Sequence, residues 1–372
     1  MNSSVQVQGP YAGSVPGEKP SPGVLKLSLR DAIQRGLEYN HGAVGLAQVL
    51  RQARGQQKSA RSQLLPNLNG SLRETVQQTN LRALGVRIPF APGVVGPFNY
   101  FDLRATLTQN LIDFTALNNY RAAQESAKAA ELAARDARDL VVLAVGGAYL
   151  QVTAAEARVE SAQAQLKTAQ AIYDQSIERN QMGVLARIDV ERSQVQLQTQ
   201  QQRVSLLEND LAKQKLNLAR IAGLAPGQRW EPADRVPFSP APDLTLEQAL
   251  TRAYEERDDL KAAKAQVRAG ERALAAAKAE RLPSLAVNAD YGVIGVNPAQ
   301  SHGTFTVTGN LRIPIWQGGR VKGDIEQSEA ILDQRRAELE DLRGRIDSDV
   351  RVAFLDLDAA ASQVRVAQKN QE

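Results

Sequence analysis

Apolar residues of the C-terminal half of segment 114–181 recur every seven positions, and alanine stands three positions after most of them. This pattern predicts one helix over 114–181, roughly 100 Å long, with a narrow seam that a neighbouring helix can approach closely. The apolar series is Val145, Val152, Val159, Leu166 and Tyr173, and the alanine series is Ala148, Ala155, Ala162 and Ala169.

The following segment, 188–222, has a matching period of seven, and a short stretch, 182–187, separates the two. Gly183 in that stretch is a suitable helix terminator, so we predict an antiparallel coiled-coil hairpin with 182–187 at its tip. Val184 and Leu185 are expected to be exposed there, and Asp189 to lie in the first turn of the outgoing helix. The matching series is Val190, Leu197, Val204, Leu211 and Leu218.

A different period, of two, marks four other segments of about ten residues. Apolar and polar residues alternate in 99–109, 284–294 and 304–315, and less regularly in 67–77. This length and period are typical of transmembrane β-strands. Four strands cannot close a barrel that has an interior, so either they form a soluble sheet over the helices or several chains pool them. Aromatic residues near the strand ends would suit interfacial girdles: Phe90, Phe98, Tyr100, Phe101, Tyr291 and Trp316.

The chain contains an internal repeat. Residues 27–33 match residues 244–250, and Leu65-Pro66-Asn67-Leu68 falls on Leu282-Pro283-Ser284-Leu285 at the same offset of 217. We therefore predict a flexible segment 1–24, a first repeat 25–223, a linker 224–243 and an incomplete second repeat 244–372. Helices are expected at 28–64, with a weak interruption near Asn40, and at 245–281 and 319–372. Pro66 and Pro283 end the first helix of each repeat.

Composition excludes several classes of protein. The 45 basic and 41 acidic residues are interspersed, which argues against nucleic-acid binding. There is no cysteine, so disulfides and thiolate sites are excluded. No run of about 18 apolar residues occurs, so we do not expect an α-helical membrane protein. Residues 1–20 have no signal-peptide pattern, and we expect a mature or trimmed form.

Catalytic and cofactor motifs are absent from the sequence. His41 and His302 are the only histidines, without metal-ligand spacing, and no P-loop or nucleophile elbow is present. The acidic pairs 255–256 and 258–259 fall at a predicted helix junction, where they favour a helix N-terminus. Gly318 and Gly319 are expected to release a strand into a helix. We predict no enzyme activity, no cofactor and no metal.

The paired long hairpins, the Leu-Pro-x-Leu entries into strands and the tip sequence 183–190 resemble the TolC family of outer-membrane efflux proteins, over residues 25–372. The resemblance implies a mainly α fold with a transmembrane β portion: long antiparallel hairpins form an α-barrel, and four strands per chain join a shared trimeric β-barrel. It implies a homotrimer in the bacterial outer membrane, in contact with its lipid, with most of the chain in the periplasm.

The resemblance also implies a function, a passive exit duct of a tripartite efflux or secretion system. The partners would be a periplasmic adaptor and, through it, an inner-membrane pump. The adaptor-docking residues would be those of the hairpin tip, namely Gly183, Val184, Leu185, Ala186, Arg187 and Asp189.

The sequence departs from the family at its end, because the second repeat stops at Glu372 before a second tip. Gating residues are therefore not assigned, and the exported substrate is not indicated. The alternative interpretation is a soluble periplasmic coiled-coil adaptor or scaffold. Such adaptors carry one hairpin between small β-domains, so two repeats and ten-residue strands favour the duct.

Overall fold

The computed structural model describes residues 10–17, 19–83, 85, 89, 92–234 and 244–369. The chain forms two compact units. Unit 1 contains Met1–Leu50, Glu131–Asp259 and Ile346–Glu372, and unit 2 contains Arg51–Ala130 and Leu260–Arg345. Each unit therefore takes segments from both predicted repeats, so the repeats are not the compact bodies of the fold.

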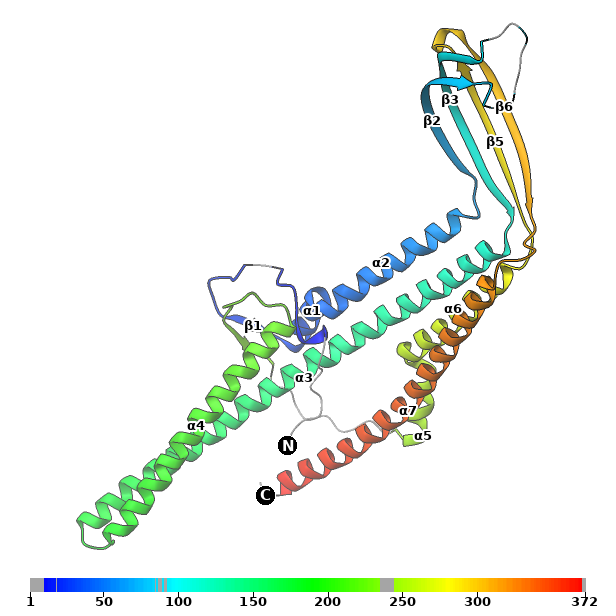
Figure 1. The fold of residues 1–372 in the computed structure, drawn as a ribbon. Helices are drawn as coiled ribbons and strands as arrows, with labels where there is room; N and C mark the ends of the chain where they lie inside the picture. The colour runs from blue at the N-terminus through cyan, green and yellow to red at the C-terminus, as the bar shows by residue number, and fades with distance from the viewer. Residues whose placement is uncertain are drawn as a thin grey trace. The chain divides into compact units, whose positions relative to one another are not determined.

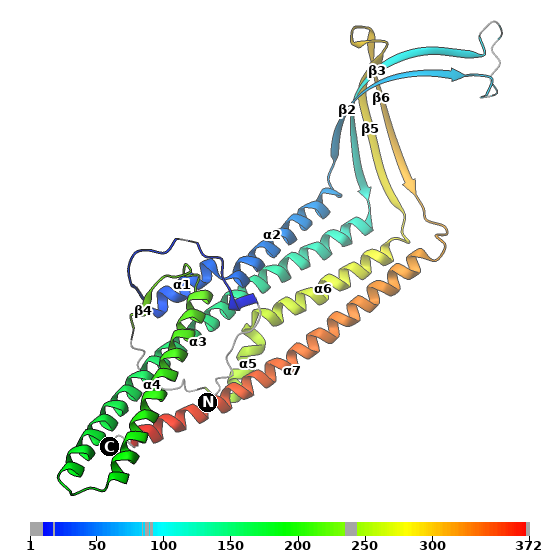
Figure 2. The same ribbon diagram turned by 60° about the vertical axis from the view of Figure 1, so that its left-hand side comes forward.

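Unit 1 is built on a helical hairpin of α3 (Phe114–Gln181), which belongs to this unit from Glu131 onward, and α4 (Arg187–Ile221). The two helices lie side by side in both views (Figure 1, Figure 2). The bounds of α3 are those predicted, and α4 begins one residue early. Val145 and Val152 are fully buried, and Val159 is 8% exposed. Leu197, Val204 and Leu218 of α4 are buried as well. The heptad seam predicted from the sequence is confirmed.

Charged and amide side chains flank this seam. Lys215 pairs with Glu156 at 2.8 Å, and Arg203 donates to Gln165 at 3.2 Å. Because alanine occupies one seam position throughout, these longer side chains can bridge two closely spaced helices. The α3 helix also contains a stretch long and apolar enough to cross a membrane. A core helix meets the same criterion, and the apolar part of α3 supplies much of the core of unit 1.

That core lies where the hairpin meets the shorter elements of unit 1. Strand β1 (Leu25–Leu27) pairs in parallel with β4 (Trp230–Pro232), and helix α1 (Leu29–Tyr39) packs beside them. Leu27, Val141, Tyr149, Leu218 and Trp230 belong to one buried cluster. The hydroxyl of Tyr149 donates to the carbonyl of Leu27 at 3.1 Å, which satisfies its only polar atom inside this cluster.

Of the N-terminal segment 1–24, which the sequence predicts to be flexible, residues 10–17 and 19–24 are described. Its described part contains a short 3-10 turn, η1 (Pro10–Ala12), and a bridge between Ser14 and Asn40. The amide of Val15 donates to the carbonyl of Tyr39 at 2.8 Å. Backbone groups that have partners in the helices hold this segment in place, and periodicity does not reveal such contacts. Of the predicted linker 224–243, residues 235–243 lie outside the described part, while residues 224–234 include buried Leu224 and Trp230.

Each predicted entry helix is in fact two helices. The first repeat has α1 and α2 (His41–Ser62), broken at Asn40, and the second has α5 (Leu246–Glu256) and α6 (Asp258–Ala279), broken at Arg257. The predictions of single helices over 28–64 and 245–281 are wrong at these points, although the first break fell where a weak interruption was expected. Asn40 and Arg257 are separated by the repeat offset of 217, so the break itself is repeated.

Unit 2 contains an antiparallel four-stranded sheet of order β2-β3-β5-β6 within the described residues (Figure 1). The strands are β2 (Asn67–Asn80), β3 (Val94–Ile112), β5 (Ser284–Gly295) and β6 (Ser301–Arg312). Strands β2 and β3 extend beyond the predicted 67–77 and 99–109, because cross-strand pairing continues past the alternating part. Strand β6 ends at Arg312 rather than at residue 315, since Pro314 lacks the donor that a ladder needs.

Helix α7 (Arg320–Lys369) follows the sheet and starts one residue later than predicted; residues 370–372 lie outside the description. In unit 2, Val321 and Ile325 of α7 pack with Ala277 of α6. The mainly α fold with a β portion, predicted from the sequence, is confirmed.

Candidate functional site

The two faces of the four-stranded sheet are chemically opposite. Pairing places Leu103 opposite Leu72 and Val293, and Tyr291 opposite Phe305. This face is exposed despite its composition, for example Leu72 by 67% and Phe305 by 74%. Burying one such side chain is worth about 1.5–3 kcal/mol, so a face of this kind is unfavourable in water. The strongly exposed members are Leu68, Leu72, Val76, Leu103, Tyr291, Phe305, Val307 and Leu311.

The opposite face is polar and internally bonded. The guanidinium of Arg104 on β3 pairs with Asp290 on β5 and with Asp102, 3.3 Å away on its own strand. It also donates to the hydroxyl of Thr304 on β6 at 3.2 Å. One arginine thus links three strands, and threonine and asparagine fill much of the rest of this face. The alternation predicted for 99–109 and 284–294 produces this segregation, as expected for a sheet between lipid and water.

Both edges of this sheet lack a partner strand among the described residues, because β2 and β6 each pair on one side only. An exposed edge presents unpaired N–H and C=O groups, which favour addition of another strand. The sheet is therefore suited to continue into strands of other chains.

The predicted docking residues gather at the end of the α3–α4 hairpin. Gly183 has φ +77, the left-handed conformation that glycine adopts at a helix stop. The amide of Val184 donates to the carbonyl of Arg179 at 3.0 Å, and Asn180 Nδ2 donates to the carbonyl of Leu185 at 2.7 Å. The tip loop is held by its own hydrogen bonds and is therefore preorganised.

The tip exposes a small apolar surface that agrees only in part with the predicted one. Val184 is 76% exposed, as expected, whereas Leu185, which was also expected to be exposed, is half-buried. Met182 and Ile188, 69% and 53% exposed, complete the surface. The docking residues predicted from the sequence did not include these two: Met182 precedes the motif 183–190, and Ile188 lies within it but was not selected.

Charged residues at the tip pair locally. Asp189 lies in the first turn of α4 and pairs with Arg192 at 3.3 Å, while Arg187 pairs with Glu191 at 3.2 Å. Ala186, the N-cap residue, is exposed. The structure therefore brings all six predicted residues together in one exposed turn, with an apolar centre and a charged rim.

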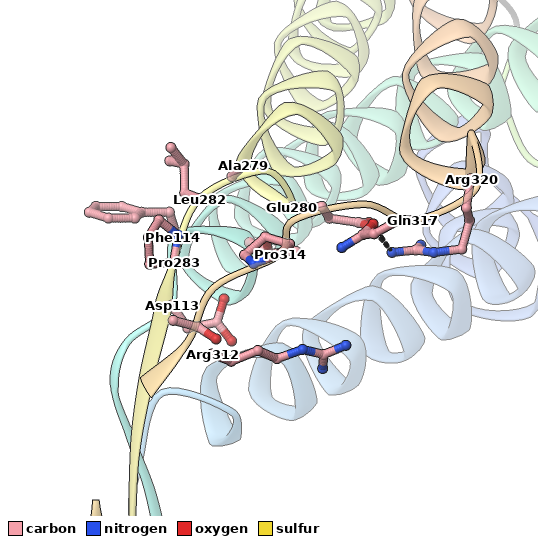
Figure 3. A pocket seen from close by; sticks show the side chains of 12 residues that line it. Asp113, Phe114, Ala279, Glu280, Leu282, Pro283, Arg312, Pro314, Gln317 and Arg320 are labelled. Atoms are coloured by element: carbon pink, nitrogen blue, oxygen red, sulfur yellow. Dashed lines mark hydrogen bonds and ion pairs between the residues drawn. The ribbon is translucent and has the colours of Figure 1, made fainter. Parts of the chain in front are cut away.

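A small pocket of about 180 Å³ lies where the strands of unit 2 give way to helices (Figure 3). Arg320 pairs with Glu280 at 2.7 Å and donates to Gln317 at 3.0 Å, and the second bond is drawn in Figure 3. Asp113 caps α3 by accepting from the amide of Ala116 at 2.8 Å. These groups are occupied in turning the chain from strand to helix, so the pocket is a structural joint.

Gly318 and Gly319 have φ of +60 and +87, which suits the predicted release of the strand into α7. Of the aromatic residues expected at the strand ends, Phe90 lies outside the described residues, while Phe98 and Tyr291 are exposed. In the described part of the chain no three histidine, aspartate or glutamate residues form a group able to hold a metal ion.

This chain is similar in sequence and in fold to known proteins. A model of the family described as outer membrane efflux protein matches residues 33–224 and 249–372. The chain is 25% identical over 344 residues to the pyoverdine export outer membrane protein OpmQ of Pseudomonas putida, covering 89% of this chain and 69% of that protein.

Solved structures with the same fold include two outer membrane proteins. The CmeC outer membrane channel of Campylobacter jejuni has a TM-score of 0.78 at 16% identity, covering 97% of this chain and 80% of that one. VceC of Vibrio cholerae has a TM-score of 0.77 at 18% identity, covering 92% and 81%.

Proposed function

This chain belongs to the outer membrane efflux protein family, and from that premise we propose that three copies form one passive exit duct that docks a periplasmic adaptor through the hairpin tips. The outer-membrane location and the efflux-channel role follow from family membership, and the resemblance to the TolC family is confirmed. The trimer, the adaptor and the docking residues belong to the proposal.

The sheet is the observation that carries this proposal. Its exposed apolar face suits lipid, its polar face suits a water-filled lumen, and its two open edges suit closure by neighbouring copies. Since four strands cannot enclose a lumen, three copies would supply twelve, enough for a channel. Because the family is one of efflux proteins, we infer a duct without enzymatic activity whose driving energy comes from a partner pump.

The sheet can be tested with two neighbouring residues of β6. Val307 lies on the apolar face, and Thr308 lies on the polar face opposite Asn288. Val307→Arg should reduce the amount of membrane-inserted, heat-modifiable oligomer strongly, because an arginine facing lipid costs about 2–4 kcal/mol at the bilayer midplane. Thr308→Arg should leave insertion unchanged. Equal effects of the two substitutions, or a water-soluble monomeric wild type, would contradict the proposal.

The docking tip supports adaptor binding through Val184, Met182 and Ile188, which are apolar and exposed on a rigid turn. Val184→Asp should weaken cross-linking to the adaptor at least tenfold while leaving oligomer formation intact, because a charge would replace the apolar centre of the contact. The matched control is Val195→Asp, at a position 62% exposed farther along α4. Loss of cross-linking in both variants would count against a contact centred on the tip.

A further inference from the structure

One flank of helix α2 carries a row of positive side chains, all of them exposed and all within unit 2. We call this row the basic stripe; its members are Arg51, Arg54, Lys58 and Arg61. Their spacings of three and four residues place them on one side of the helix. The residues that precede three of them, Ala53, Gln57 and Ala60, are half-buried. The stripe therefore lies about 100° around the helix from its partly covered side.

The basic stripe has no acidic residue near it on its own helix. No aspartate or glutamate occurs in the sequence between Glu38 and Glu74. Among the described residues, no ion pair involves Arg51, Lys58 or Arg61. Like charges at these helical spacings repel one another. The stripe is therefore suited to an external partner that is negatively charged along its length.

The equivalent positions of the second repeat carry charges of mixed sign. At the offset of 217 they are Arg268, Glu271, Ala275 and Lys278. Arg268 pairs with Glu125 of α3 at 2.8 Å. Lys278 pairs with Glu329 of α7 at 3.3 Å. Contacts between helices of this chain thus use single charges with a partner of opposite sign, whereas the basic stripe has one sign throughout.

The basic stripe ends where the apolar surface of the sheet begins. Helix α2 stops at Ser62, and strand β2 starts at Asn67 (Figure 1). Exposed apolar side chains continue to this end of the sheet, among them Leu65, Ile315 and Trp316. Tryptophan is enriched where a membrane meets water. Because the helices of an outer membrane efflux protein lie in the periplasm, this level is the periplasmic boundary of the lipid core.

Position along α2 separates the four cations into two pairs. Arg61 and Lys58 lie roughly 2 and 6 Å before the end of the helix. Arg54 and Arg51 lie roughly 12 and 17 Å before it. The headgroup layer is about 5–8 Å thick on each side of a bilayer, and the Debye length at physiological ionic strength is about 8 Å. Only Arg61 and Lys58 therefore lie at the depth of the headgroups.

We propose that the basic stripe binds the phosphate groups of acidic phospholipids in the periplasmic leaflet of the outer membrane, with Lys58 and Arg61 in the headgroup layer. Guanidinium and ammonium groups both bind phosphate, the guanidinium through two parallel hydrogen bonds. Each cation close to an anionic membrane surface strengthens binding roughly fivefold. The partner is a lipid surface rather than a second copy of the chain, because a lipid surface presents a single sign of charge. This inference rests on the membrane-spanning sheet of the proposed function.

A local quenching experiment tests this inference. The chain contains no cysteine, so Ser62→Cys provides one site per chain for a fluorophore beside Arg61. The labelled protein is reconstituted in phosphatidylcholine vesicles with a small fraction of nitroxide-labelled lipid, either phosphatidylglycerol or phosphatidylcholine. Labelled phosphatidylglycerol should quench the fluorophore equally well at a mole fraction about fivefold lower, or less. High salt should remove most of this preference, because it screens charges near the membrane surface.

Two double variants test the position of the contact. Lys58→Gln combined with Arg61→Gln should bring the preference for phosphatidylglycerol close to one. The matched control is Arg51→Gln combined with Arg54→Gln, which removes the same charge from the same flank. It should lower the preference by less than about twofold, because these residues lie more than a Debye length from the headgroups. Equal effects of the two pairs, or a Ser62→Cys protein without a preference, overturn the proposal.

The oligomer formed by each protein separates this inference from the proposed function. If no heat-modifiable oligomer inserts into phosphatidylcholine alone, the membrane-spanning sheet fails, and the lipid contact fails with it. If the oligomer inserts but shows no preference for phosphatidylglycerol, only the lipid contact fails. If Lys58→Gln with Arg61→Gln disrupts the oligomer in detergent without lipid, the stripe contacts a second copy, which also overturns the proposal.

Discussion

The α1–α2 and α5–α6 breaks have the same backbone and different side-chain chemistry. Asn40 and Arg257 both extend the chain for one residue, and the flanking helices have equal lengths, 11 and 22 residues in each repeat. At the first break an amide side chain is sealed in the core; at the second, a guanidinium is held among carboxylates at a partly exposed site. A duplicated fold can thus keep the backbone of a bend while it holds one copy with a buried neutral side chain and the other with a partly exposed ion pair.

The first break is held by uncharged partners. Asn40 Nδ2 donates to the carbonyl of Tyr11 at 2.8 Å, and Asn40 Oδ1 accepts from the amide of Gly42 at 2.9 Å. None of these groups changes its charge near neutral pH. At the second break, the residue equivalent to Gly42 is Asp259, whose carboxylate binds Arg257. Asn40 thus accepts a hydrogen bond from a backbone amide at the first break, whereas Arg257 donates to a carboxylate at the second, so the second break is held by an ion pair.

The largest expected effect comes from placing a charge in the neutral break. Asn40→Asp removes the amide donor to Tyr11 and buries a carboxylate, which should destabilise the protein by about 3–5 kcal/mol at pH 7.5. The loss should be smaller at pH 5, because a buried carboxyl group has a raised pKa and is then protonated. Thermal unfolding of purified protein at the two pH values measures this. An unchanged melting temperature at pH 7.5 would show that burial of Asn40 does not constrain the break.

A smaller effect is expected from Gly36, the residue of α1 that packs on the hairpin. A β-carbon at this position would lie 2.5 Å from Cγ2 of Val145, closer than real contacts allow. Gly36→Ala should therefore cost about 1–3 kcal/mol through overpacking. The second repeat has Ala253 at the equivalent position, so Ala253→Gly is the matched control. It should cost no more than about 1 kcal/mol, the helix propensity difference. Denaturant midpoints of the two variants compare the packing directly.

The smallest effect is expected at Arg257, the cation of the α5–α6 break. Arg257→Gln removes the positive charge that opposes the raised pKa of Asp136, so the titration midpoint of Asp136 should move above 6. The stability change should be about 1 kcal/mol or less, because Arg257 is partly exposed. Carboxyl titration followed by NMR with labelled aspartate measures the midpoint. A midpoint that falls would mean that Arg257 does not face Asp136.

Much of the fold could be predicted because its elements rest on short-range periodicity. Seven-residue spacing identified the α3–α4 seam, and two-residue spacing identified the alternating faces of β3, β5 and β6. The ends of the strands were harder to predict. Strand β2 continues to Asn80 and strand β3 begins at Val94 because the two strands pair with each other, and the sequence of one strand carries no information about its partner. The sequence located the tip residues together, but it did not reveal that Met182 and Ile188 are exposed, because the exposure of a side chain there depends on the conformation of the loop.

Sequence alone determined the duplicated order of helices and strands, the hairpin seam and the amphipathic sheet, because each depends on residues near one another in the chain. Only the tertiary structure decided where the entry helices break and what surrounds each break. Asn40 donates to Tyr11 across 29 residues of sequence, and the charge of Arg257 acts on the pKa of Asp136 across 121 residues. Burial and the charge of distant neighbours set the pKa of Asp136, and neither quantity is a property of the local sequence.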